Sequence, residues 1–565
     1  MRACLGLLAG VVGCAAASMP LRAHACGGTF CDSGPQPVRV DQSGENVLFV
    51  RLDSEIEAHV QIRYQGDPAR LAWLVPMPEV PDITVGSQPL FDALLADSAP
   101  VFGVRTTTMA CDGTTETSES TGCGGGATSA PARGGVANEN DQSGAMMDPI
   151  GKTVGSFDIT ILQPSDSEEV LQWIRDNDFQ LPEQTQALID PYVKGGSVIV
   201  AIRMAPGAGV QEIHPIVFRY PGTRASIPIQ LTAVAATVDM RVRTFVLGPG
   251  RTVPSNYRSV EPNVARLNWP SFASNYESVV SAAVDETGDG LGFVTEYAGP
   301  SKAIVGGGVY DERWDSAPFL DMGPQEAVAE LFRQGQITCQ GAFCSFPHPL
   351  VLPLLQRYIP APAGSDENGF YGCQLCDEDQ IDFAAWDAEA FARDYRERII
   401  EPAQHARELL QQQPYLTRLV TFMSPDEMIA DPAFHLRSDL PNVDREHWAA
   451  QTIACDKAPT IELPDGREIV LGASLAWPGS DASVPSAERI EQIPETGKAQ
   501  VVLDQGAEID AALERINERN RRRVGGVSNL GSNGGTCRVS GSLAQQSFWI
   551  GAALLYLLRR RQRLH

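Results

Sequence analysis

The cysteines are the residues whose types and spacing offer the clearest chemistry in this sequence. Close pairs of cysteines can form disulfides, supply thiolates to zinc or work as a redox couple. In an oxidising compartment they are usually disulfides, so we expect bridges between near neighbours. Their spacing does not fix the connectivity. The candidate pairs are Cys26 with Cys31, Cys111 with Cys123, and Cys339 with Cys344, which leaves Cys373, Cys376 and Cys455.

Two other uses of the same cysteines stay open. A zinc site could draw on Cys339 with Cys344 and Cys373 with Cys376, because zinc ligands often come as two close pairs. The segment Cys373-Gln-Leu-Cys376 could instead be a redox couple, although no thioredoxin-like βαβ pattern surrounds it. The signs of export described below favour disulfides over both alternatives.

The histidines match no metal-binding motif. Those outside the terminal segments form no H-E-x-x-H pattern, and none lies within a helical turn of another. We therefore expect no zinc protease, no bound metal and no cofactor. His214 stands beside Pro215 at the start of a strand, where we expect a structural role. The six histidines are His59, His214, His348, His405, His435 and His447.

Acidic residues could serve in two further kinds of site. The loops at residues 285–290 and 365–369 offer oxygen ligands to calcium, but neither has the spacing D-x-[DN]-x-[DN]-G, so we interpret them as solvated turns. A glycosidase needs two carboxylates on opposite sides of a sugar, and Glu296 with Asp285 or Glu261 could supply them. Because the chain has 70 Asp and Glu residues, some such pair is always available.

No pattern commits the sequence to a reaction. The G-x-S-x-G elbow of serine hydrolases and the phosphate-binding G-x-x-x-x-G-K-[ST] loop are both absent, so we predict no catalytic residue. A formal net charge of -26 disfavours binding of nucleic acid or of anionic lipid by the folded part. We favour a non-enzymatic binding, adhesion or structural module of unknown ligand. The alternative is a surface hydrolase acting on polysaccharide or peptide.

The N-terminus has the features of a secretory signal. Arg2 is followed by an apolar run and by Ala23-His24-Ala25, an A-x-A cleavage site that would leave Cys26 as the first mature residue. A competing interpretation takes Val11-Val12-Gly13-Cys14 as a lipoprotein cleavage box, but the apolar run before it is only about eight residues long. We therefore predict an exported protein.

The apolar periodicity predicts an α+β fold with a β-rich first half and a helix-rich second half. Alternating segments at 45–76 and 196–254 are typical of antiparallel strands, and we place the second in the middle of a sheet. An amphipathic helical stretch at 384–411 is interrupted at Pro402. The expected organisation is a signal peptide at 1–25, a β-rich domain at 26–300 with a flexible insertion at 112–150, a helix-rich domain packed on it at 301–472, a linker and stalk with one charged helix at 473–536, and a short hydrophobic tail at 537–565.

Several of these segments carry a family resemblance. In order along the chain they are RLAWLVPMPEVPDITVGSQPLFDAL, FDITIL, LTAVAATVDMRVRTFVLG, VPSNY, FVTEYAGP and PYLTRLVTFMSPDEM. Together they resemble the bacterial family called domain of unknown function 2330, over a range from about Cys26 to Gly472. The resemblance implies an exported protein and carries over no activity and no catalytic residue.

The C-terminus carries a second resemblance. Gly534-Gly535-Thr536-Cys537, the apolar run Phe548 to Leu558 and the basic end Arg559, Arg560, Arg561 resemble the myxobacterial sorting tag. The resemblance implies processing near Cys537, modification of that cysteine and transfer to the cell surface or outer membrane. The partners would be the export and sorting machinery and a membrane, reached through the tail or a lipid. An ordinary tail anchor, or a periplasmic location, is the alternative; the apolar run is short of the roughly 20 residues that span a bilayer.

Overall fold

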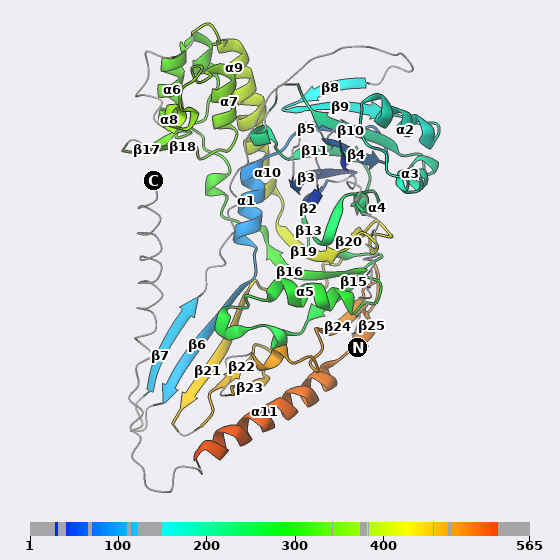
Figure 1. The fold of residues 1–565 in the computed structure, drawn as a ribbon, viewed down its shortest axis with the longest axis vertical. Helices are drawn as coiled ribbons and strands as arrows, with labels where there is room; N and C mark the ends of the chain where they lie inside the picture. The colour runs from blue at the N-terminus through cyan, green and yellow to red at the C-terminus, as the bar shows by residue number, and fades with distance from the viewer. Residues whose placement is uncertain are drawn as a thin grey trace, which may run out of the picture.

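Two β-sheets packed face to face form the centre of the molecule (Figure 1). The computed structural model describes residues 29–528 except 32–40, 53, 66–70, 110–114, 122–149, 207, 209, 342, 373–380, 382, 456 and 473–476. The expected signal at 1–25 and the expected tail at 537–565 therefore lie outside the described residues. Among the described helices, none has the length and apolarity needed to cross a membrane.

The larger sheet has ten strands in the order β25-β24-β15-β16-β19-β13-β2-β3-β11-β5. Neighbouring strands are antiparallel except for β13 with β2 and β15 with β16. The strands are β2 (Asp41–Arg51), β3 (Glu55–Gln65), β5 (Asp82–Val85), β11 (Ile216–Pro221), β13 (Ala236–Gly248), β15 (Arg258–Pro262), β16 (Gly292–Pro300), β19 (Tyr415–Met423), β24 (Ala487–Gln492) and β25 (Gln500–Asp504).

The smaller sheet has five antiparallel strands in the order β1-β4-β10-β9-β8. They are β1 (Thr29–Cys31), β4 (Leu71–Met77), β8 (Ile150–Val154), β9 (Phe157–Leu162) and β10 (Val198–Met204). The stretch at 196–254, expected within one sheet, thus contributes to both: β10 belongs to the smaller sheet, and β11 and β13 belong to the larger. The short helix α4 (Ile229–Thr232) interrupts the run between β11 and β13.

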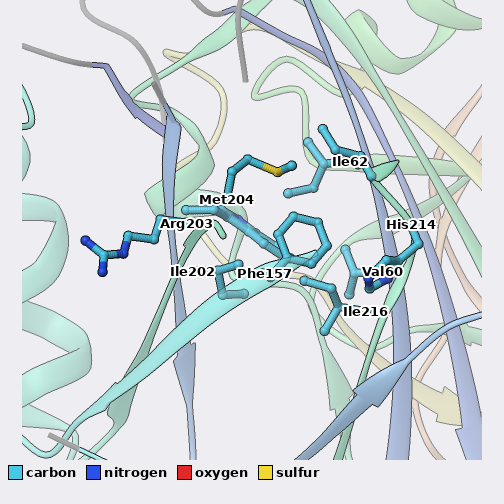
Figure 2. A pocket seen from close by; sticks show the side chains of 10 residues that line it. Val60, Ile62, Phe157, Ile202, Arg203, Met204, His214 and Ile216 are labelled. Atoms are coloured by element: carbon cyan, nitrogen blue, oxygen red, sulfur yellow. The ribbon is translucent and has the colours of Figure 1, made fainter. Parts of the chain in front are cut away.

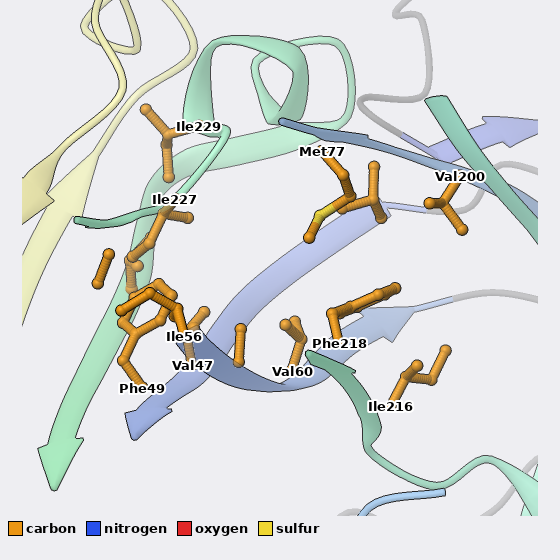
Figure 3. Packing of buried hydrophobic residues seen from close by; sticks show 14 of the residues in the cluster. Val47, Phe49, Ile56, Val60, Met77, Val200, Ile216, Phe218, Ile227 and Ile229 are labelled. Carbon is orange, nitrogen blue, oxygen red and sulfur yellow. The ribbon is translucent and has the colours of Figure 1, made fainter. Parts of the chain in front are cut away.

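Alternation of side chains along each strand builds the core between the sheets (Figure 3). In β3, Ile56, Ala58 and Val60 all point into this core because residues two apart share a face. Trp73 of the smaller sheet meets Phe218 of the larger edge to face, with ring centroids 6.1 Å apart. These contacts join the two sheets into a sandwich.

Helices cover both outer faces of the sandwich, which makes four layers. On the smaller sheet lie α2 (Ser167–Asp176) and α3 (Thr185–Lys194), and Val170, Leu171 and Ile174 share the buried face of α2. On the larger sheet lie α1 (Gln88–Asp97), α5 (Tyr276–Asp285) and α10 (Glu401–Gln412). The larger sheet is therefore covered on both faces.

Two further units extend from this centre (Figure 1). A helical cluster with its own apolar core consists of α6 (Pro324–Arg333), α7 (Val351–Tyr358), α8 (Glu367–Gly372) and α9 (Ala388–Tyr395). A side sheet, on which α11 (Gly506–Ser528) packs, consists of β6 (Val101–Met109), β7 (Thr115–Thr121), β21 (Glu446–Ala454), β22 (Thr460–Glu462) and β23 (Glu468–Val470). Shorter strands are β12 (Ala225–Ser226), β14 (Thr252–Pro254), β17 (Thr338–Gln340), β18 (Phe343–Ser345) and β20 (Ala433–Leu436).

The α+β class, with a β-rich first half and a helix-rich second, is confirmed. The structure differs from the expected organisation in two places. Part of the expected linker forms β24 and β25 at the edge of the larger sheet, where the charged side chains of an edge strand can stay in solvent. Part of the expected insertion forms β7, paired with β6. Residues 122–149 of that insertion lie outside the described residues.

Candidate metal centre

Strand β3 has a row of polar residues on the face opposite its apolar one. Glu57, His59, Gln61 and Arg63 alternate with the core residues, which is the pattern of a strand with one solvated face. Helices α1 and α10 cover this face instead, and Glu57 and His59 are fully buried. Buried charged or polar groups of this kind need partners, and these two find them in the strand next to β3 and in a helix far along the chain.

His405 approaches the cluster from α10. Pro402 stands in the first turn of that helix, and a π-helical turn, Arg396–Ile400, directly precedes it. In this turn the N–H of Glu401 donates to the carbonyl of Arg396, five residues back. Because proline cannot donate a backbone hydrogen bond and clashes with the preceding turn, the wider π turn lets the helix continue past it. The interruption expected at Pro402 is thus a local widening of the helix, which continues through His405.

Three side chains converge on the carboxylate of Glu57. The Nε2 atoms of His59 and His405 lie 2.7 Å and 2.6 Å from the same oxygen, Oε1. Their imidazole rings are stacked, with centroids 6.2 Å apart. The other oxygen, Oε2, accepts hydrogen bonds from Nε and Nη2 of Arg219, which stands directly opposite Glu57 on β11. One oxygen therefore serves both histidines and the other serves the arginine.

These contacts keep Glu57 ionised. Burial by itself raises the pKa of this carboxyl, but hydrogen bonds from His405, His59 and Arg219 outweigh it and bring the pKa well below its usual range. An ionised carboxylate can only accept hydrogen bonds, so each histidine must present Nε2 as an N–H donor. The cluster thus holds one negative charge and two exchangeable imidazole protons at a single oxygen.

The cluster has the donor set of a transition-metal site. One carboxylate oxygen and two imidazole nitrogens lie within 4.8 Å of one another. Zinc takes this combination of ligands in proteins, and an arginine on the second carboxylate oxygen would act as an outer-shell partner that fixes its orientation. The His405 side chain is 36% exposed, whereas the other two ligands are buried, so the open side of the cluster lies at the helix. The residues present fit a metal ion held by Glu57, His59 and His405.

Sequence reasoning missed this cluster because the motif it considered places both histidines on one helix. Here Glu57 and His59 share one face of a strand, and the third ligand comes from the second half of the chain. The available signal was the Glu-x-His pair, which puts Glu57 and His59 next to each other on the polar face of β3.

The structure tests some of the cysteine predictions and does not describe the residues of the others. Cys339 and Cys344 form a disulfide that joins β17 to β18, as expected. This bond removes both thiolates, so the zinc site built from Cys339, Cys344, Cys373 and Cys376 is wrong. Cys455, for which the sequence suggested no partner, is also disulfide-bonded. The side chain of Cys31 is not described, and Ala25, Cys26, Cys111, Cys123, Cys373, Cys376, Cys537, Arg559, Arg560 and Arg561 lie outside the described residues.

The carboxylates considered for glycoside hydrolysis are engaged separately. Glu296 is buried and accepts a hydrogen bond from Nε of Arg418 at 2.5 Å. Glu261 stands among Glu488 and Arg489, in a different neighbourhood. The third candidate, Asp285, has a pKa raised by burial and by nearby acids including Glu427. The arrangement gives no paired acid and base.

The acidic loops considered for calcium also use their oxygens internally. Asp289 of the first loop pairs with Arg258, with 2.5 Å between Oδ1 and Nη1. Glu367 of the second accepts a hydrogen bond from Gln356 at 3.0 Å. Within the described part of the chain, neither loop brings together three groups that could hold a metal ion.

His214 has the structural role expected of it. It borders a small apolar cavity of about 40 Å³ between the two sheets, and Figure 2 shows it near Phe157 and Val60. Its Nδ1 donates to the carbonyl of Pro215 at 2.8 Å, and its Nε2 accepts from the N–H of Ser156 at 3.2 Å. Burial, with some help from the nearby cation of Arg398, lowers the pKa of His214 to about 4. The ring is therefore neutral at physiological pH.

The fold and the cluster define a four-layered α+β protein with a buried Glu-His-His centre. The chain belongs to the family described as "Uncharacterized protein conserved in bacteria (DUF2330)", whose model matches residues 20–303. The match contains Glu57, His59 and Arg219 but ends before His405 and before the segment PYLTRLVTFMSPDEM. No curated protein and no solved structure matches the chain.

Proposed function

We propose that this is an exported cell-envelope protein that binds a divalent transition-metal ion, zinc in the first instance, through Glu57, His59 and His405. The observation that carries the proposal is the convergence of two imidazole Nε2 atoms on one oxygen of a buried, ionised carboxylate. A binding module needs no acid–base pair, which agrees with the separate engagement of the other carboxylates.

Metal binding here requires Nε2 of both histidines to give up its proton. Without metal, both histidines donate Nε2–H to Oε1 of Glu57. For a metal ion to bind, the proton on each Nε2 would have to move to Nδ1 of the same ring, because the ligands are unprotonated nitrogens and the carboxylate oxygen. Arg219 can keep its hydrogen bonds to Oε2 throughout.

The envelope location is the second part of the proposal. Its support is the signal-like segment ending at Ala25 and the tail with Cys537 and its basic end. We place the folded part outside the inner membrane, at the outer membrane or cell surface, with the periplasm as the alternative. The tail or a lipid on Cys537 would hold it there after the export and sorting machinery has acted.

Zinc titration of the demetallated protein tests the metal site. We expect one ion per chain by calorimetry and by elemental analysis. His59→Ala and His405→Ala should each weaken binding by more than about 100-fold, because each removes a direct ligand. His447→Gln is the matched control, since that histidine lies in the side sheet on β21. Wild-type protein that takes up no zinc, or a His405→Ala variant that binds as the wild type does, would overturn the proposal.

A surface hydrolase acting on polysaccharide or peptide is the second candidate. The observation that favours it is the exposure of His405, because three protein ligands with an open side leave a zinc position free for water. The zinc-loaded protein should then cleave a peptide or polysaccharide mixture, and His405→Ala should not. If the zinc-loaded protein cleaves neither, the binding module stands alone.

A further inference from the structure

A second polar feature lies further along the same face of β3. Ser43, Gly44, Glu45, Asn46, Arg63, Arg241 and Arg243 line a hollow of about 240 Å³. They come from β2, β3 and β13, which are neighbours in the larger sheet (Figure 1). The proposed metal centre uses none of these residues.

Strand register explains why the hollow exists. Gly44 on β2 stands directly between Arg63 on β3 and Arg241 on β13, and Arg243 stands beside Asn46. Because glycine has no side chain, the sheet surface between the two flanking arginines is open. Three guanidinium groups therefore border one recess in a protein whose net charge is -26.

The positive charge of the hollow is only partly balanced. Glu277 of α5 pairs closely with Arg241 and lies 4.0 Å from Arg243. Among the described residues, the guanidinium of Arg63 makes no hydrogen bond or ion pair. Nε of Arg243 is buried and has no hydrogen-bond partner within the same part of the chain. The three guanidinium groups thus face Glu277 and, less directly, Glu296, which is itself paired with Arg418.

Two shifted pKa values fit this imbalance. Burial and then the charges of Arg241 and Arg418 lower the pKa of Arg243 to about 9. Burial also raises the pKa of Glu45 to about 7, so this second acid is only partly ionised at neutral pH. A bound anion would relieve the repulsion among the arginines and satisfy the free N–H groups.

We propose that this hollow binds the phosphate group of a small phosphate-bearing molecule. Arginines pair with phosphate through two parallel hydrogen bonds, and three guanidinium groups opposed by Glu277 and a partly ionised Glu45 leave a net positive charge that suits an anion with several acceptor oxygens. The hollow is smaller than the roughly 300 Å³ at which ordinary ligand pockets begin, so a compact ligand fits it and a polymer does not. Inorganic phosphate and a phosphate monoester share this chemistry.

Calorimetric titration of the full chain with inorganic phosphate and with glycerol phosphate tests the site. A chelator is present throughout, so that no bound metal contributes, and His405→Ala should bind phosphate as the wild type does. Arg243→Gln and Arg63→Gln should each weaken binding at least tenfold. Arg175→Gln, an exposed arginine paired with Glu168 on α2, is the matched control and should change nothing.

The outcomes distinguish inorganic phosphate from a phosphate monoester as the ligand, and they show when the proposal fails. Tighter binding of glycerol phosphate than of phosphate points to a monoester, and the reverse points to the free ion. Arg63 is exposed, so Arg63→Gln should fold even if Arg243→Gln does not. Absence of binding to wild-type protein, or equal binding by wild type and Arg63→Gln, overturns the proposal whatever the zinc titration gives.

Discussion

Nε2 of His405 lies 2.6 Å from Oε1 of Glu57, although the two residues are 348 positions apart in the chain. The contact joins α10 to β3 across the outer face of the larger sheet. It brings the second half of the protein into a cluster whose other members lie within the family match, residues 20–303. A substitution in this cluster therefore also removes a contact between the two halves of the chain.

Glu57→Gln should destabilise the fold by about 3 kcal/mol, because removing one partner leaves the others of a buried charge network unpaired. Folding lowers the pKa of the wild-type Glu57 carboxyl. Its contribution to the free energy of unfolding is therefore complete above the unfolded pKa of about 4.3 and declines as the pH falls below that value. Urea denaturation at pH 7 and pH 3 should therefore show a smaller difference from wild type at pH 3. Glu168→Gln, from an exposed pair, should cost less than about 1 kcal/mol; equal effects would contradict the network.

Arg219→Gln should weaken zinc binding by about 10-fold without abolishing it, because an outer-shell partner orients a ligand and does not replace it. Calorimetry in parallel with His405→Ala checks this ranking. If Arg219→Gln abolishes zinc binding while the protein stays folded, Arg219 does more than orient the Glu57 carboxylate, and the outer-shell role is wrong.

Gly155→Ala should destabilise the protein far more than Gly196→Ala. Both glycines have positive φ, +60° and +82°, so both substitutions strain the backbone. A Cβ at Gly155 would lie 2.0 Å from Nε2 of His214, whereas a Cβ at Gly196 meets no atom within 4 Å. We expect about 1 kcal/mol for Gly196→Ala and at least 2 kcal/mol more for Gly155→Ala. Urea unfolding of both variants measures the difference, and similar losses would argue against close packing at His214.

His214 should make the protein less stable on mild acidification. Its pKa is about 4 when folded and about 6.5 when unfolded, so the unfolded chain binds the extra proton and stability falls as pH drops from 6.5 to 4. The loss attributable to this residue is about 3 kcal/mol. Nuclear magnetic resonance titration of the ring gives the folded pKa, and denaturation of His214→Gln should show a flatter pH dependence. A ring that titrates near 6.5 in the folded protein would refute the buried neutral state.

Cys537→Ala should abolish surface display if the tail is a sorting tag. Intact mass and surface protease treatment of the native protein should give a chain that begins at Cys26 and ends near Cys537 with added lipid. An intact tail on a protein facing the periplasm would show that the tag resemblance does not apply, and would favour a periplasmic role in the envelope.

Local patterns foretold much of the fold and little of the site. Strands β2, β3 and β4 follow from the apolar alternation at residues 45–76, and the irregular helix around Pro402 follows from the missing N–H of proline. The same alternation predicts that Glu57 and His59 face solvent. The pattern of one strand carries no information about α10, a helix about 340 residues later that covers this face. Strand β24 was mistaken for a linker because only Ala487 and Ile490 of its six residues are buried, which leaves little apolar alternation to detect.

Strand β19 lies between β13 and β16, yet more than a hundred residues separate it from the end of the family match at 303. A nascent chain that has not yet delivered residues 415–423 therefore has two unpaired strand edges inside what will become its largest sheet. The sheet closes only after most of the chain has been made, so folding of the whole is tied to the arrival of a late strand. A chain released early would carry exposed edges that can pair with other chains, and a chaperone that keeps it extended until residue 423 has emerged would protect against aggregation.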